Sequence, residues 1–414
     1  KLKLFFFFKM PKLLSVTMLH RHGSRGPGAS ELTPWGDDHP IKSQWKEEER
    51  ENLSSIGRLQ CELLGQWYVN QYINSGILET SPQRIFWRCS KSDRAKESGE
   101  DFVRGFNNAI GYQAVGAHPE YYSSDADNYF RPWKIFKEAA NDIKDRQNTA
   151  EEWKRKTEET KEFLTEVFTQ VGALPSLLAK PQKALWACTY LHAVKECEEY
   201  WPHEEGDRHE FSKVYLPQYE SKVTELALWV WEQRFLYSGY KVEMGGRMAI
   251  DILEHVLNLE HSINFFSGHD YTLLGTICAL NLVSEFKIAM NFSAFILFEF
   301  WDSPPNDSIL LNENYNGPTV RILLNPTPFK NIDGSASRTV QTNAIRLLND
   351  YKVNDIVNIL QELRLQTKDL YMKPIKKEKE AHDASQPITN ATALNDSSIK
   401  QTEHEQETEI DMLS

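Results

Sequence analysis

Short apolar runs alternate with amphipathic stretches over most of the chain. The short runs are rich in β-branched or aromatic residues and are bounded by polar or structure-breaking residues, which is typical of strands. The first run also suits a buried strand of a parallel sheet, and the last two are expected to be antiparallel neighbours. The predicted strands are Leu13–Leu19, Ile85–Trp87, Ile263–Phe266, Phe295–Trp301 and Thr319–Leu324.

Apolar residues at helical spacing predict helices between and after these strands. Ser54 or Ser55 can cap the first helix, Gly76 closes it, and Gly245-Gly246 opens the third. Strands that alternate with helices indicate the α/β class. The predicted helices are Leu53–Ile73, Glu220–Tyr237, Gly245–Leu259, Tyr271–Leu280 and a final helical region, Val340–Leu365.

Three stretches depart from this alternation. Thr33–Arg50 is rich in Pro, Trp and charge, and we expect an exposed connection there. Lys134–Phe168 is highly charged with sparse apolar residues, which predicts exposed helices. The sequence from Lys373 onward is polar and nearly free of large apolar residues, so it should be disordered. We therefore expect an α/β core formed by residues 10–110 and 218–370, a helical insertion over 111–217, and a polar tail over 371–414.

A cationic loop follows the first predicted strand, where LLSVTML gives way to HRHGSRGP. Arg21 and Arg25 offer planar forks of donors that match phosphate oxygens. In an open α/β sheet, ligands bind beyond the carboxyl ends of the strands, which is where this loop lies. A lone Arg-His pair would indicate a solvated basic turn, but two imidazoles, two guanidiniums, two glycines and a proline crowd this strand end. The loop predicts a phosphate site.

Two further strand ends carry candidate residues. Arg88 ends the second strand in RCSKSDR, and His269-Asp270 follow the third in SGHD. Alone, Arg88 would indicate a surface salt bridge, and Asp270 would indicate a helix cap. Their position at strand ends instead places them with the candidate phosphate site. Arg94 is expected to pair with an acid and is left out of that site.

Together and in this order, the three motifs resemble the histidine acid phosphatases, the acid phosphatase and phytase branch (branch 2) of the histidine phosphatase superfamily. RHGSRGP is similar to the RHGxRxP signature, RCSKSDR to RSTDxDR, and His269-Asp270 to the HD motif. Cys89, Lys91 and Tyr271 depart from the family pattern. The resemblance spans most of the chain. It implies a three-layer α/β core with a mixed, mostly parallel central sheet (phosphoglycerate mutase-like) and an inserted helical cap.

The resemblance also implies a mechanism. Phosphoryl transfer spreads charge over three equatorial oxygens, so fixed cationic donors are its main requirement. We expect a metal-independent phosphomonoester hydrolase with an acidic optimum, a small-molecule substrate and no cofactor. By the resemblance His22 is the nucleophile that forms a phosphohistidine, Asp270 is the proton donor, and the phosphoryl group is bound by Arg21, Arg25, Arg88 and His269.

Other functions remain open at this point. The same fold can serve a phytase-like, lysophosphatidate or sugar-phosphate specialist, or a mutase. A catalytically silent phosphate-binding module is disfavoured because the chain retains the nucleophile, the arginines and the acid. A serine hydrolase is disfavoured because neither Ser24 nor Ser267 lies in a GxSxG motif. His203–His209 holds ligand-type side chains, but their irregular spacing is more typical of a solvated loop, so no metal is assigned.

The composition disfavours some classes of binding partner but does not determine the cellular location of the protein. The 414 residues carry a formal net charge of −12, which disfavours nucleic acid, and no apolar run is long enough to span a membrane. The five cysteines form no CxxC, and Cys188 and Cys197 are compatible with a bridge or with free thiols. The apolar run near Lys1 is shorter than a signal-peptide core, and Met10 is an alternative start. These features favour an intracellular protein, whereas the resemblance allows a secreted or lysosomal one; the sequence leaves the oligomeric state open.

Overall fold

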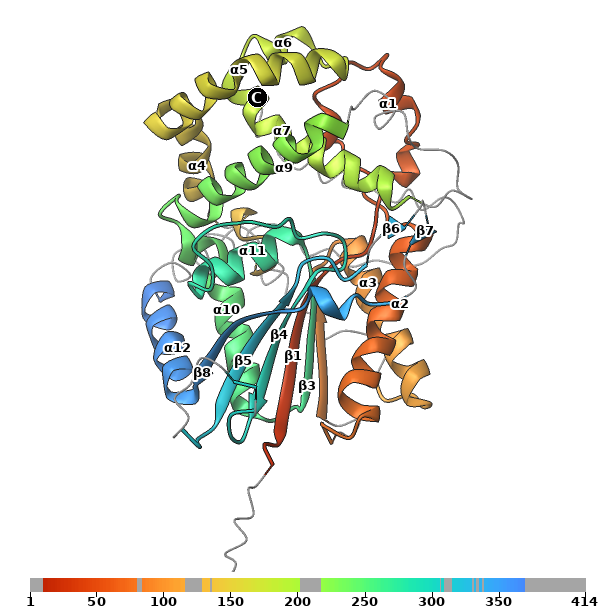
Figure 1. Ribbon diagram of the computed structural model, residues 1–414, viewed down its shortest axis with the longest axis vertical. Helices are drawn as coiled ribbons and strands as arrows, with labels where there is room; N and C mark the ends of the chain where they lie inside the picture. The colour runs from red at the N-terminus through yellow and green to blue at the C-terminus, as the bar shows by residue number, and fades with distance from the viewer. Residues whose placement is uncertain are drawn as a thin grey trace, which may run out of the picture.

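A six-stranded sheet with strand order β2-β3-β1-β4-β5-β8 forms the centre of the protein (Figure 1). The computed structural model describes residues 10–79, 84–115, 129–134, 136–201, 217–305, 307–308, 315–329, 331–332, 335–336 and 339–368. The strands are β1 (Leu13–Arg21), β2 (Ile85–Cys89), β3 (Ile263–Gly268), β4 (Phe295–Trp301), β5 (Thr319–Asn325) and β8 (Arg346–Lys352), with a short separate pair, β6 (Asn331–Ile332) and β7 (Ser335–Ala336).

The sheet is mixed, as predicted. Strand β3 pairs in parallel with both β1 and β2, whereas β4 is antiparallel to β1 and to β5, and β8 is antiparallel to β5. Strands β1, β2, β3 and β5 therefore point the same way. The predicted antiparallel pairing of the fourth and fifth strands is confirmed, with Phe295 opposite Asn325 and Trp301 opposite Thr319.

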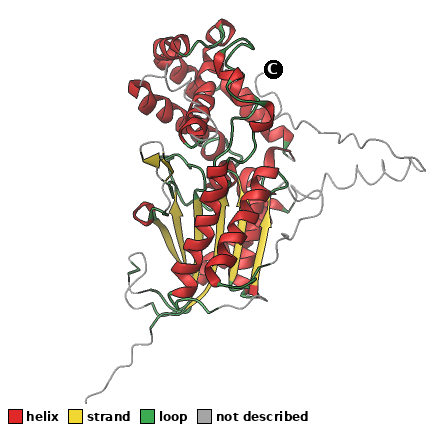
Figure 2. Cartoon of the chain, turned by 90° about the vertical axis from the view of Figure 1, so that its right-hand side faces the viewer, coloured by secondary structure: helices red, strands yellow, loops and turns green. Residues whose placement is uncertain are grey.

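Helices cover both faces of the sheet and its upper end (Figure 2). Five-residue π-helical segments extend two of them, α2 and α9, over Asn70–Asn74 and Glu232–Leu236. The helices are α1 (Pro40–Ser43), α2 (Ser55–Val69), α3 (Asp93–Ile110), α4 (Lys137–Thr149), α5 (Glu151–Gln170), α6 (Pro175–Leu178), α7 (Pro181–Glu199), α9 (Pro217–Trp231), α10 (Lys241–Asn258), α11 (Asp270–Ala279) and α12 (Val353–Thr367).

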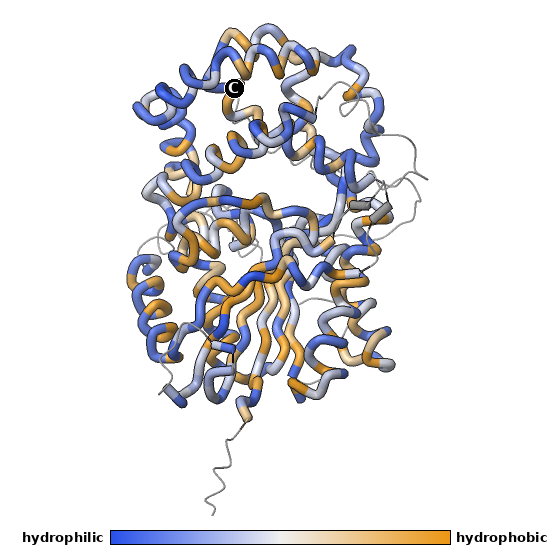
Figure 3. The backbone as a smooth tube through the Cα atoms, in the orientation of Figure 1, coloured by the Kyte–Doolittle hydropathy of each residue, from blue (hydrophilic) through white to orange (hydrophobic). Residues whose placement is uncertain are grey.

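Side chains of the sheet pack in two directions because successive residues of a strand point to opposite faces. In β4, Phe295 and Leu297 join a buried cluster with residues of α2 and α3, whereas Ile296 and Phe298 join one with residues of α10 and α11. Figure 3 shows the resulting apolar band along the strands. A sheet buried on both faces explains the near-continuous apolar runs of the sequence, and the expected three-layer α/β core is confirmed.

Helices α4 to α7 and α9 form a separate group beyond the carboxyl ends of β1, β2 and β3 (Figure 1). This group has its own buried cluster, in which Trp153 of α5, Trp186 of α7 and Val230 of α9 take part. The exposed character predicted for Lys134–Phe168 is therefore wrong for one face of α5. Its apolar residues are few but large, and a sparse stripe of large side chains is sufficient to bury one helix face.

The segment after the cationic loop also belongs to this cluster. Trp35, Ile41 and Trp45 are buried in it, and Trp35 Nε1 donates a hydrogen bond to the Val171 carbonyl oxygen at 2.8 Å. The exposed connection predicted for Thr33–Arg50 is therefore wrong. The prolines and charged residues of this segment lie outside the strands, but its tryptophans are buried against the helical group.

Two predicted helices have different bounds in the structure. The region 340–365 was predicted to be helical, but part of its first half forms the edge strand β8. The local sequence shows no clear alternation of apolar and polar residues, so this strand depends on main-chain pairing with β5. Helix α10 begins at Lys241, so Gly245-Gly246 lie inside it and do not open it. A Cβ at Gly245 would lie 1.9 Å from the Gly275 carbonyl oxygen, so this glycine permits the close contact between α10 and α11.

Two further observations concern the chain as a whole. No helix among the described residues is long and apolar enough to cross a membrane. All five cysteines, Cys188 and Cys197 included, are buried free thiols. The polar tail predicted over 371–414 lies outside the described residues, and the predicted domain boundaries remain a prediction.

Candidate active site

The parallel pairing of β1 and β3 brings two of the three motifs together. His20 is aligned with Ser267 and Arg21 with Gly268, and the His22 amide then donates to the Gly268 carbonyl oxygen at 2.9 Å. The rings of His22 and His269 face each other edge to face, with centroids 5.5 Å apart. The strand ends predicted to share one edge therefore meet there.

The loop after β1 turns sharply because helix α2 lies directly against it. A Cβ at Gly23 would lie 2.2 Å from the Gly57 carbonyl oxygen, so only glycine fits at this position. The Gly23 amide donates to Ser98 Oγ at 3.0 Å and the Ser24 amide donates to Gln60 Oε1 at 2.9 Å. Helices α2 and α3 thus fix the backbone that carries His22.

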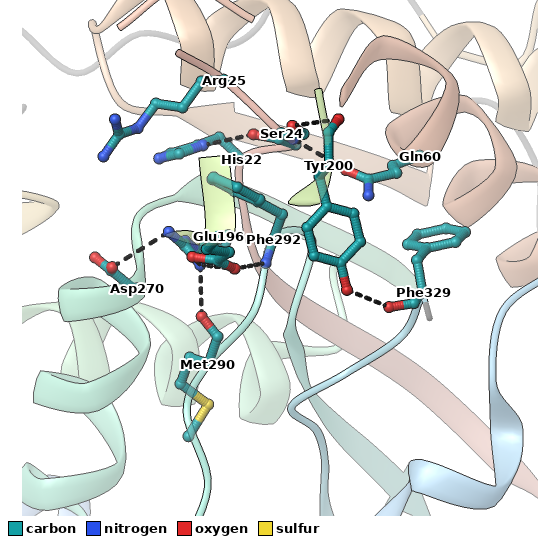
Figure 4. Close-up of polar contacts among 12 residues, drawn as sticks. His22, Ser24, Arg25, Gln60, Glu196, Tyr200, Asp270, Met290, Phe292 and Phe329 are labelled. Carbon is teal, nitrogen blue, oxygen red and sulfur yellow. Dashed lines mark hydrogen bonds and ion pairs between the residues drawn. The ribbon is translucent and has the colours of Figure 1, made fainter. Parts of the chain in front are cut away.

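His22 is buried and its tautomer is fixed by one hydrogen bond (Figure 4). Its Nδ1 lies 2.8 Å from the Gly23 carbonyl oxygen. A carbonyl oxygen can only accept, so Nδ1 carries the proton and Nε2 presents a lone pair. An imidazole in this state is equipped for nucleophilic attack through Nε2.

The surroundings keep this imidazole neutral. Burial lowers the pKa of His22 well below its ordinary value, and the charges of Arg94, Arg21 and Arg25 lower it further. Both effects disfavour the imidazolium cation. His22 therefore retains its Nε2 lone pair in mildly acidic solution.

Arg21 is held by an acid from the helical group. Its Nη1 donates to Glu196 Oε1 and Oε2 at 2.8 and 2.9 Å and to the Met290 carbonyl oxygen at 2.6 Å (Figure 4). Its guanidinium lies over the Phe292 ring, 4.2 Å from the centroid. Its Nη2 lies 3.5 Å from Asp270 Oδ2. Arg21 is thus fixed between β1, α7 and α11, with Asp270 beside it.

Arg25 is fixed in the same manner by a carboxylate of its own loop. Its two terminal nitrogens form a bidentate pair with Glu31, at 2.9 and 2.7 Å, and Nη1 also donates to the Gly26 carbonyl oxygen at 2.8 Å. The Gly28 amide donates to Glu31 at 2.7 Å. A bidentate pair of this kind sets the plane of the guanidinium, so Arg25 is preorganised.

His269 and Asp270 occupy the start of α11. His269 Nε2 lies 3.1 Å from Ser90 Oγ, and among the described residues its Nδ1 has no hydrogen-bond partner. Burial lowers the pKa of His269 well below its ordinary value, with further lowering by Arg94 and Arg131. Asp270 is the first residue of the helix and is partly exposed, with 18% of its side chain accessible. A carboxyl group at the border of the site can exchange protons with a bound ligand or with water.

Comparisons with known proteins indicate the family and the fold. Residues 12–184 match the family model described as the histidine phosphatase superfamily (branch 2). That stretch, which contains RHGSRGP and RCSKSDR, is similar to the branch 2 histidine phosphatases. The predicted resemblance to this family is thereby confirmed over these residues, whereas His269-Asp270 lie beyond them. A search of curated proteins finds no match.

Solved structures with the same fold include several bacterial phytases. The apo form of Hafnia alvei phytase aligns with a TM-score of 0.60 at 12% identity, over 85% of this chain and 97% of that one. The Citrobacter braakii phytase aligns with a TM-score of 0.58 at 15% identity, over 85% and 98%. Hafnia alvei phytase in complex with myo-inositol hexakis sulphate aligns with a TM-score of 0.56 at 13% identity, over 85% and 97%. At these identities the likeness establishes the histidine phosphatase fold.

The two arginines of RCSKSDR lie in different surroundings in this histidine phosphatase fold. Arg88 Nη1 pairs with Asp251 of α10 at 3.0 Å, and its guanidinium lies over the Phe86 ring. Arg94 pairs with Glu51 at 3.0 Å, which confirms its predicted pairing with an acid. It is also the charged group that most strongly lowers the pKa of both His22 and His269. The electrostatics therefore favour Arg94 over Arg88 as a neighbour of the candidate nucleophile.

Two site residues were not among the sequence candidates. Arg94 stands in the quoted motif, so a signal for it existed. Glu196 had no such signal, because it lies in a charged stretch of α7 that is 175 positions from Arg21 in the chain. Burial raises the pKa of Glu196, and the charge and hydrogen bonds of Arg21 oppose that rise.

A metal centre was considered from the sequence and not assigned. Within the described ranges, no group of three or more His, Cys, Asp or Glu side chains is arranged to hold a metal ion. The ligand-type segment His203–His209 lies outside the described residues.

Proposed function

We propose that the protein is a phosphomonoester hydrolase that acts through a phosphohistidine on His22. One observation carries the proposal: a buried histidine with a free Nε2 lone pair is surrounded by the charges of Arg21, Arg25 and Arg94. The family match supports the phosphatase class. The covalent intermediate, the site roles and metal independence are parts of the proposal.

The reaction follows in two displacements. His22 Nε2 attacks the phosphorus in line, the bond between phosphorus and the ester oxygen breaks, and Asp270 gives its proton to the departing alcohol oxygen. Water then attacks the phosphohistidine, Asp270 takes a proton from it, and the bond between phosphorus and Nε2 breaks to release phosphate. The arginines and His269 Nδ1 stabilise the equatorial oxygens in both steps.

A phytase-like activity is a second candidate. The solved structures that share the fold include phytases, and one of these is in complex with myo-inositol hexakis sulphate. Inositol polyphosphates therefore belong in any substrate comparison. Whether such substrates are favoured depends on the charges around the site.

Hydrolysis of p-nitrophenyl phosphate without added metal tests the proposal. We expect the rate to be the same in EDTA, because the arginines supply the positive charge that a metal would otherwise provide. We also expect kcat/KM to show no fall as the pH drops through about 6.5, the ordinary pKa of histidine, because the pKa of His22 is lowered and the neutral nucleophile persists. A rate that EDTA abolishes, or an acid limb at that pH that reports His22 protonation, would contradict the proposal.

We propose that Arg94 binds the phosphoryl group and that Arg88 is structural. Arg94→Ala is expected to lower kcat/KM for p-nitrophenyl phosphate by about 10²-fold or more, the usual loss when one preorganised donor is removed. The matched control, Arg88→Ala combined with Asp251→Asn so that no buried carboxylate is left unpaired, should lose less than about tenfold. Thermal melting verifies that both variants fold. A comparable loss in the folded control would restore Arg88 to the phosphate site.

A further inference from the structure

A cavity of about 310 Å³ is lined in part by Glu196, the acid that accepts from Arg21. It adjoins the candidate active site, because the charges of Arg21 and Asp270 also act on His192 in its lining. A cavity of this size suits a small organic group. Its lining residues are His192, Lys195, Glu196, Glu199, Glu220, Thr224, Lys287, Ile288, Ala289 and Asn291.

The cations of this lining are already paired. Lys195 Nζ forms ion pairs with Glu199 and, at 2.8 Å, with Glu220. Lys287 pairs with Glu285 at 2.7 Å. Neither ammonium group is thus available to a ligand without the loss of an ion pair.

The remaining charge of the lining is negative. Glu196, Glu199 and Glu220 outnumber Lys195 and Lys287 by one among the lining residues. His192 adds no positive charge, since burial lowers its pKa to about 4. Among the described residues, the lining of this cavity therefore adds no uncompensated cation to the arginines around His22.

Positive charge around His22 and negative charge in the cavity favour some substrates over others. Each further phosphate of a polyphosphorylated alcohol carries about −1.5 to −2 charges near neutral pH. Such a group in the cavity would face carboxylates and cations that are already compensated, at a cost in desolvation and repulsion. Hydroxyl or ammonium groups would instead find carboxylate acceptors.

We propose that this cavity receives the alcohol half of the substrate and selects monophosphate esters whose alcohol bears no second anionic group. The inference rests on the proposed function and narrows it to a substrate class. It separates this protein from the phytases that share its fold, because a hexakisphosphate belongs to the disfavoured class. Glu199 and Glu220 are the residues that set the preference, through Lys195.

Substrate comparison in the wild-type protein gives the first test. The probes are p-nitrophenyl phosphate, glycerol 2-phosphate, phosphoethanolamine and phytate. We expect kcat/KM for glycerol 2-phosphate and phosphoethanolamine to exceed that for phytate by about tenfold or more. Phytate hydrolysis at least as efficient as that of the two monophosphates would overturn the inference while leaving the phosphatase proposal intact. Failure to hydrolyse any of the four would reject the proposed function and this inference with it.

Charge variants test the residues. Glu199→Gln with Glu220→Gln releases Lys195 and should raise the ratio of kcat/KM for phytate to that for p-nitrophenyl phosphate by roughly tenfold, since two nearby negative charges are removed. Lys195→Gln should lower the same ratio. The control Glu225→Gln removes a carboxylate of α9 that pairs with Lys222 outside the cavity, so its ratio should match the wild type. A ratio in the double variant equal to that of the control would overturn the assignment.

Discussion

The variant His22→Ala is expected to lower kcat for p-nitrophenyl phosphate by at least about 10⁴-fold, the scale on which covalent catalysis is lost when the nucleophile is removed. Nothing else in the described site offers an unprotonated nitrogen that is both surrounded by the arginines and oriented by a backbone carbonyl. His22 Nε2 holds its lone pair because Nδ1 is committed to the Gly23 carbonyl oxygen. Steady-state kinetics of the purified variant provides the measurement.

His20 offers a matched control for this variant. It is also a buried histidine, its Nδ1 lies 3.0 Å from the Arg21 carbonyl oxygen, and burial lowers its pKa to about 4. However, its ring stacks on Phe102 on the side of the sheet occupied by α3. We expect His20→Gln to retain kcat within about tenfold of the wild type, provided that thermal melting shows a folded protein. If the two variants lost activity equally, His22 would have no special role.

Asp270→Asn is expected to show an effect that depends on the leaving group. An alkoxide is a poor leaving group, so kcat for glycerol 2-phosphate should fall by about 10²–10⁴-fold, the range of general-acid catalysis. The p-nitrophenolate anion departs without a proton, so the loss for p-nitrophenyl phosphate should be less than about tenfold. The ratio of the two losses is the quantity to measure.

This ratio separates proton donation from two other roles of Asp270. The carboxylate lies 3.5 Å from Arg21 Nη2 and accepts from the Tyr271 amide at 2.7 Å, so the substitution also alters the setting of Arg21 and of the start of α11. Those effects would lower the rates for both esters by the same factor. Equal losses would therefore assign Asp270 to positioning and remove it as the proton donor.

The sequence was sufficient for the parts of the fold that depend on local pattern and burial. Apolar runs such as Leu13–Leu19 predicted strands correctly, because strands of a sheet that is buried on both faces consist mostly of apolar residues. The meeting of His22 with His269 also followed, since parallel strands bring their carboxyl ends to one edge. Strand β8 and the buried Trp35 and Trp45 did not follow, because both depend on partners distant in the chain.

The distinction that we propose between Arg88 and Arg94 has a basis in the sequence. Phe86 and Arg88 are two positions apart in β2, so the pleat directs them to the same face, the one that packs on α10. Trp87 and Cys89 point to the opposite face, with α2 and α3. An arginine on the α10 face is directed to Asp251, whereas Arg94 lies in the first turn of α3, next to its first residue Asp93.

The contact of Glu196 with Arg21 could not be predicted from the sequence, for a different reason. Its contact with Arg21 exists only because α7 packs over the strand ends, and that placement arises from the tryptophan-rich cluster of the helical group. No local pattern in α7 distinguishes Glu196 from Glu198 or Glu199. The cavity that bears on substrate choice depends on the same packing, so substrate class was the part of the function that the sequence left most open.

Trapping the intermediate tests the central claim most directly. The wild-type protein would be mixed with p-nitrophenyl phosphate, quenched in alkali within the turnover time, digested, and analysed by mass spectrometry. We predict a phosphoryl group on the peptide that contains His22, absent from His22→Ala and lost when turnover is complete. Rapid turnover with an unmodified His22 peptide at every quench time, or a phosphoryl group on a different residue, would contradict the account.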